Sequence, residues 1–101
     1  MTEYDLFIPL SYNDGTPVEP EKLERLRQRL FEQFGGLTDL RHRSAGQWRV
    51  GGVTFHDEIV IFRVLGDSRT ASPFLHALKE ELERDLRQED VLIVARIVEV
   101  L

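Results

Sequence analysis

Large side chains recur at every second position in the first segment of the chain, which is the pattern of a half-buried β-strand. The residues concerned are Tyr4, Leu6, Ile8, Leu10 and Tyr12. We therefore predict a strand over Tyr4–Tyr12, interrupted at Pro9, where the backbone lacks one hydrogen-bond donor. The turn-forming residues Asn13-Asp14-Gly15 follow it and end the strand.

The apolar spacing then changes to three or four residues, which predicts two helices. The first is expected over Pro20–Phe34, because proline suits the first helical position and Gly35-Gly36 can end a helix in the left-handed conformation. The second is expected to begin at Ser72-Pro73, with serine as the N-cap. The apolar stripes consist of Leu23, Leu26, Leu30, Phe31 and Phe34 in the first helix and of Leu75, Leu78, Leu82 and Leu86 in the second.

Three more strands complete the predicted secondary structure. They are expected over Leu37–Val50, with an irregularity near Ser44-Ala45-Gly46, over Val53–Leu65, and over Val91–Leu101. The order β-α-β-β-α-β predicts a single α+β domain over residues 1–101 with a ferredoxin-like fold. In this fold two helices cover one face of a four-stranded antiparallel sheet, and the sheet order is fourth, first, third, second.

The sheet face that the helices leave open is also expected to be apolar. The last strand places Leu92, Val94, Val98 and Val100 on one face and Val91, Ile93, Ala95, Ile97 and Leu101 on the other. The third strand places Ile59, Ile61 and Leu65 on one face and Val60, Phe62 and Val64 on the other. Both faces of these strands are therefore apolar, and the helices can cover only one of them. Monomers rarely expose an apolar patch of this kind, so we predict a homodimer whose sheets pack face to face. Three alternatives remain open: a bulge that changes the assignment of faces, a different protein partner, and a ligand pocket on this face.

Composition and charge narrow the classes of function. The chain has 101 residues, of which 42% are hydrophobic and 31% charged, with a net charge of −5 and no cysteine. The acidic balance disfavours nucleic acid and anionic membranes as partners, and the absence of cysteine excludes disulfides and thiolate nucleophiles. No apolar run reaches the roughly 18 residues of a membrane span, and no secretory signal pattern is present, so a cytoplasmic location is predicted.

Polar residues gather on both sides of the predicted Gly51-Gly52 turn. His56-Asp57-Glu58 begins the third strand, and Trp48 and Arg49 lie across the turn. His56 and Glu58 share a face at a spacing of two, as a general base and its orienting partner would. This pattern favours a small cofactor-independent enzyme of the dimeric α/β barrel kind as the alternative function. The same residues are also typical of a solvated strand end, and a lone tryptophan is most often a core or interface anchor.

Arg41 and Arg43, together with Arg49, form a small basic patch that suits an anion or RNA. The segment 53–59 lacks the basic-glycine-aromatic signature of the RNA-recognition motif, which disfavours RNA. The histidines and acids, among them His42, match no standard metal-ligand spacing, so no metal and no cofactor is predicted. The leading hypothesis is a small binding or protein-interaction module without catalysis.

Two motifs connect the chain with a known group of sequences. They are Phe34-Gly35-Gly36-Leu37-Thr38 and Gly46-Gln47-Trp48-Arg49, accompanied by Gln88-Glu89-Asp90-Val91 ahead of the last strand. With these motifs the chain resembles an uncharacterised family of small bacterial proteins of unknown function. The resemblance covers most of the chain and implies a ferredoxin-like fold and no known activity.

Overall fold

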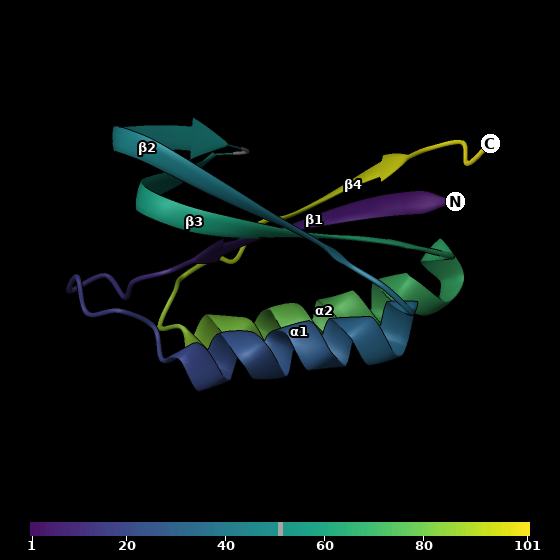
Figure 1. Cartoon of the computed structure of the whole chain (residues 1–101), viewed down its shortest axis with the longest axis horizontal. Coiled ribbons are helices and arrows are strands. Elements are labelled where there is room, and N and C mark those ends of the chain that lie inside the picture. The colour runs from purple at the N-terminus through teal and green to yellow at the C-terminus, as the bar shows by residue number, and fades with distance from the viewer. Residues whose placement is uncertain (51) are drawn as a thin grey trace.

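A computed structural model of the chain describes residues 1–50 and 52–101, and it describes the side chains of all of these except 42–48, 50 and 53–57. The elements are β1 (Thr2–Pro9), α1 (Pro20–Phe34), β2 (Thr38–Val50), β3 (Val53–Gly66), α2 (Ser68–Asp85) and β4 (Ile93–Ile97). The strands form one antiparallel sheet in the order β2-β3-β1-β4. Both helices lie along the same face of this sheet (Figure 1). The predicted ferredoxin-like fold and strand order are confirmed.

The main core lies between the sheet and the two helices. The alternating residues of β1 and β3 face the helices, and the apolar stripes of α1 and α2 cover them. The most deeply buried members are Leu6, Ile8, Val60, Phe62, Val64, Leu30 and Leu78. The large alternating residues of the first strand, Tyr4, Leu6 and Ile8, are therefore the ones that face the helices.

The Phe34-Gly35-Gly36 segment ends α1 as expected. Gly35 has φ 78°, and its N–H donates to the Phe31 carbonyl at 2.8 Å. The Phe34 ring then packs so close to the backbone of Gly66 that a Cβ there would lie 2.9 Å from it. The motif thus joins the end of α1 to the end of β3 through close packing.

Helix α2 begins at Ser68, so the predicted start at Ser72-Pro73 is wrong. Asp67 caps the helix by accepting a hydrogen bond from the Arg69 N–H at 2.9 Å, and Pro73 lies inside the helix. An aspartate is as good an N-cap as a serine, and a helix can lose one main-chain hydrogen bond at a proline when packing holds it. The extra turn brings Ala71 into the core, where it is 1% exposed.

The first and last strands also differ from the predicted bounds. Strand β1 begins earlier, because Thr2 pairs with Gly66, and it ends at Pro9, since residues 10–18 form a loop in which Leu10 and Val18 share a hydrogen bond. Strand β4 is shorter than Val91–Leu101 because it pairs only with β1, over Ile93–Ile97. β-Propensity extends beyond both ends of β4, but strand structure requires a partner strand.

Strands β2 and β3 form a long hairpin whose far end curls to the side of the sheet opposite the helices (Figure 1). The pairing register shifts between Arg43 and Gln47, where the sequence predicted an irregularity. Such a shift increases local twist and bends a strand. The hairpin therefore gives the open face a rim at one end.

Candidate functional site

The open sheet face carries a second, smaller group of apolar side chains, which we call the open-face cluster. It consists of Phe7, Ile59, Ile61, Leu92 and Val94. Ile59 is 1% exposed and Phe7 is 8% exposed, so the chain itself covers part of this face. The sequence-based expectation of a wholly uncovered apolar face is therefore corrected: Ile61, Leu92 and Val94 remain half-buried, and Leu65 is 43% exposed.

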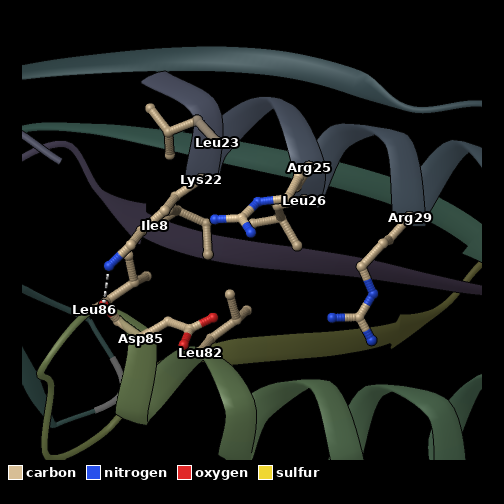
Figure 2. A pocket seen from close by; sticks show the side chains of 9 residues that line it. All are labelled: Ile8, Lys22, Leu23, Arg25, Leu26, Arg29, Leu82, Asp85 and Leu86. Carbon is tan, nitrogen blue, oxygen red and sulfur yellow. Dashed lines mark hydrogen bonds between the residues drawn. The ribbon is translucent and has the colours of Figure 1, made fainter. Parts of the chain in front are cut away.

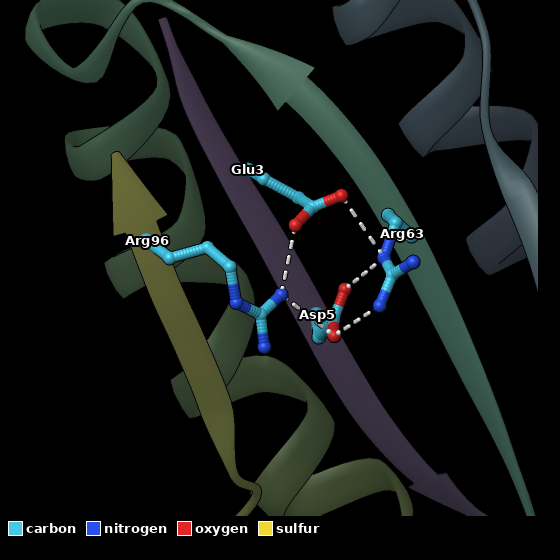
Figure 3. A network of polar contacts seen from close by, with 4 residues as sticks. All are labelled: Glu3, Asp5, Arg63 and Arg96. Atoms are coloured by element: carbon cyan, nitrogen blue, oxygen red, sulfur yellow. Dashed lines mark hydrogen bonds and ion pairs between the residues drawn. The ribbon is translucent and has the colours of Figure 1, made fainter. Parts of the chain in front are cut away.

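Beside the open-face cluster lie four charged side chains, Glu3, Asp5, Arg63 and Arg96, which we call the ionic network (Figure 3). The strand register brings them together, since Asp5 is opposite Arg63 on β3 and Glu3 is opposite Arg96 on β4. Arg63 donates to both oxygens of Asp5, at 2.8 Å from Nε and 3.0 Å from Nη2. Arg96 Nη1 lies 2.9 Å from Glu3 and 3.1 Å from Asp5, and Arg63 Nε lies 3.1 Å from Glu3.

Asp5 is the centre of the ionic network. Its side chain is only 3% exposed, whereas those of Arg63 and Arg96 are 37% and 43% exposed. Burial alone would raise the pKa of Asp5, but the hydrogen bonds from Arg63 and Arg96 outweigh it and hold the pKa below its usual value. The hydrogen bond to Asp5 raises the pKa of Arg63, and the hydrogen bonds to Glu3 and Asp5 raise the pKa of Arg96, so all three groups stay charged.

The sequence analysis did not identify the ionic network, although the sequence carries a signal for it. Glu3 and Asp5 are spaced by two and so share a face of β1. Arg63 is an isolated charge within the apolar run of residues 59–65, and Arg96 is the one charge of β4. A charge within an apolar strand usually has a partner, and the strand order of the fold places these four residues on adjacent strands.

The Phe34–Thr38 motif forms one wall of a shallow hollow of about 390 Å³ at the end of the sheet. The ionic network contributes Glu3 and Arg63 to the same hollow, and Val64 and Leu65 complete it. The motif therefore shapes the surroundings of the network from one side. Within the motif, Gly35 and Gly36 face open space, since a Cβ built on either glycine would have no atom within 4 Å.

The predicted site around the Gly51-Gly52 turn falls largely outside the described side chains. The side chains of Trp48, His56 and Asp57 lie outside the described ones. The backbone register pairs Trp48 with Phe55 and Gln47 with His56. Glu58 is half-buried and lies opposite Arg43 on β2. The backbone thus brings Trp48 and His56 to neighbouring positions of the hairpin, and Glu58 lies further along it.

The predicted basic patch is only partly described. Arg43 and His42 fall outside the described side chains, and Arg41 and Arg49 are exposed. Arg41 lines a hollow together with Glu21, Glu24 and Arg27 of α1, so acids lie beside it. Within the described residues, no group of three metal-ligating side chains occurs, and no helix is long and apolar enough to cross a membrane.

Comparison with known proteins gives a match of fold alone. No protein-family model matches the chain, and no curated protein matches it in sequence. Among solved structures, the chain is similar to a phage SAM lyase in complex with S-methyl-5'-thioadenosine, with a TM-score of 0.67 and 15% sequence identity. The similarity covers 94% of this chain and 79% of that chain. At this level of identity the two proteins share the fold, and residue roles do not transfer.

Proposed function

We propose that the protein is a small binding module that forms a homodimer through its open sheet face. The observation that carries this proposal is the combination of half-buried apolar residues with a charged network on one face that no helix covers. Ile61, Leu92 and Val94 retain exposed apolar surface there. Burial of that surface in a dimer would contribute roughly 25 cal/mol per Å² to association.

The charges of the ionic network favour a second copy of the chain as the partner. The network contains two acids and two arginines, so it is formally neutral, and its charges alternate across three strands. In a twofold interface the same patch of each copy faces that of the other copy. Because this patch is neutral and its charges alternate in sign, the two copies can approach without net repulsion. The buried charges would then set the register between the two sheets, as buried polar residues do in other interfaces.

The arginines also keep donors for a partner. Arg63 Nη1 and Arg96 Nη2 make no hydrogen bond to the described part of the chain, and each guanidinium is more than one-third exposed. Guanidinium groups that carboxylates hold in place are suited to donate further hydrogen bonds, because their orientation is already set. In the proposed dimer these donors would bind acceptors on the facing copy.

The first prediction concerns the mass of the protein in solution. The unchanged protein is expected to elute as a dimer in light scattering on a sizing column. Val94→Asp is expected to elute as a monomer, because it replaces apolar interface surface with a carboxylate, lies opposite Asp5 on β1, and makes the formally neutral face acidic. The matched control is Ala95→Asp, since Ala95 is exposed and projects to the other face of β4. Circular dichroism checks that both variants fold. A monomeric unchanged protein across the dilution series, or a folded dimer of Val94→Asp, would contradict this interface.

We propose as a second candidate a small enzyme, favoured by the fold similarity to a SAM lyase. The residues expected to act are His56 and Glu58, which the sequence analysis selected. The expected reaction in this case splits SAM: the carboxylate of SAM attacks the side-chain carbon bonded to sulfur, that carbon–sulfur bond breaks, and the products are S-methyl-5'-thioadenosine and the lactone of the amino-acid part. Liquid chromatography follows both products, and His56→Ala is expected to abolish the conversion. Heat-denatured protein is the control. Absence of product at high protein concentration would remove this candidate and leave the binding module.

A further inference from the structure

The two helices enclose a groove of about 110 Å³ on the side of the sheet opposite the ionic network (Figure 2). Its apolar lining consists of Ile8, Leu23, Leu26, Leu82 and Leu86. A volume of this size holds about four water-sized groups, since each occupies about 30 Å³. The groove can therefore receive a short aliphatic chain.

Four charged residues surround this apolar lining, and two of them are already paired. Lys22 Nζ donates to the Tyr12 hydroxyl at 2.8 Å and to the Asp85 main-chain carbonyl at 2.9 Å. Arg29 Nη1 lies 2.5 Å from a carboxylate oxygen of Glu81. These contacts fix Lys22 and Arg29 as parts of the groove wall.

The other two charged groups, the Arg25 guanidinium and the Asp85 carboxylate, have no hydrogen bond or ion pair within the described residues, although both line the same groove. Figure 2 shows Arg25 extending from α1 and the Asp85 carboxylate extending from α2 into the space between the helices. Both side chains are exposed, and an ion pair between exposed groups contributes little to stability, so the two charges need not approach one another. Here they stay apart, on the two sides of an apolar space.

We propose that this groove binds a small zwitterion, an α-amino acid with an aliphatic side chain of about the size of leucine. Its carboxylate would accept paired hydrogen bonds from the Arg25 guanidinium, which is suited to bidentate recognition of a carboxylate. Its ammonium group would donate to Asp85, and its side chain would lie over Leu26, Leu82 and Leu86. The ligand satisfies both unpaired charges at once, which neither a simple anion nor a simple cation does.

The test is a titration of the full chain, labelled with ¹⁵N, with L-leucine, followed by amide chemical shifts. We expect saturable shifts at α1 and α2 with a Kd of about 1 mM or tighter. Isocaproate (4-methylpentanoate), which lacks only the ammonium group, and isoamylamine, which lacks only the carboxylate, should each bind at least about tenfold more weakly. Equal binding of leucine and isocaproate, or no shifts with leucine up to about 10 mM, would overturn the proposal.

Two variants test whether Arg25 and Asp85 are the groups that bind the ligand. Arg25→Gln and Asp85→Asn should each raise the Kd for leucine by at least about tenfold, a loss of about 1.4 kcal/mol. Both residues are exposed, so the fold should tolerate the changes. Arg69→Gln is the matched control, because it makes the same change of charge at a side chain that is 88% exposed and lies outside the groove. An unchanged Kd in Arg25→Gln would overturn the proposal. The groove lies on the helix side, so this result does not depend on the proposed dimer.

Discussion

Truncation of Phe62 to alanine is expected to lower the free energy of unfolding by about 3–5 kcal/mol. Phe62 is 0% exposed and sits on β3 between Leu6 of β1 and Asp39 of β2 in the strand register. The Arg27 guanidinium lies 5.3 Å from the ring centroid and covers its outer side. Removal of the ring therefore leaves a cavity and also takes away the surface on which Arg27 rests. Urea unfolding followed by circular dichroism measures the change.

The matched control for Phe62 is Phe31, the same residue type on the surface. Phe31 lies on α1 and is 56% exposed, so Phe31→Ala should change the free energy of unfolding much less. A typical single domain is stable by about 5–15 kcal/mol, so a loss of about 3–5 kcal/mol would remove a large fraction of the free energy of unfolding. A loss in Phe62→Ala no greater than that in Phe31→Ala would contradict the placement of Phe62 in the main core, on one of the two central strands.

The fold is predictable from the sequence because two periodicities are almost uninterrupted. The alternation from Tyr4 to Ile8 and the leucine stripes of the helices each require one buried face, and only one common arrangement of six such elements buries them all. The ends of the elements were less predictable. Asp67 and Ser72 are both good N-caps, and the choice between them depends on packing by Ala71, which no local pattern contains.

The candidate site was harder to predict for a different reason. The members of the ionic network come from three separate strands, and Glu3 is 93 residues from its partner Arg96. Their contact depends on the strand register, and a shift of one residue would place Arg63 or Arg96 on the other face of the sheet. The sequence also does not predict that Arg25 and Asp85 line one groove, because charged residues on two separate helices have the pattern of ordinary solvent-exposed residues.

Replacement of Asp5 by asparagine is expected to lower the free energy of unfolding by about 1.5–3 kcal/mol at neutral pH. Asp5 accepts charge-assisted bonds from Arg63 and Arg96, and its side chain is 3% exposed. An asparagine of similar shape fills the same space, but its amide group cannot balance the two positive charges. Glu3→Gln is the control, because Glu3 is more exposed, at 18%, and its loss leaves the centre of the network intact. Both should be measured at one protein concentration, since the network lies on the proposed dimer interface.

The pH dependence separates this electrostatic role from simple packing. Burial works to raise the pKa of Asp5, but the bonds from Arg63 and Arg96 hold it below its usual value in the folded state. The folded protein therefore releases the Asp5 proton more readily than the unfolded chain, and the resulting stabilisation is complete well above the unfolded pKa of about 3.9 and disappears as the pH falls through the lower folded value. The difference in unfolding free energy between the unchanged protein and Asp5→Asn should consequently narrow as the pH falls below about 4. A difference that stays constant from neutral to acidic pH would mean that Asp5 contributes by shape alone. The ionic network would then be no more than a filler of the open sheet face, and its proposed part in setting the register of a dimer would lose its physical basis.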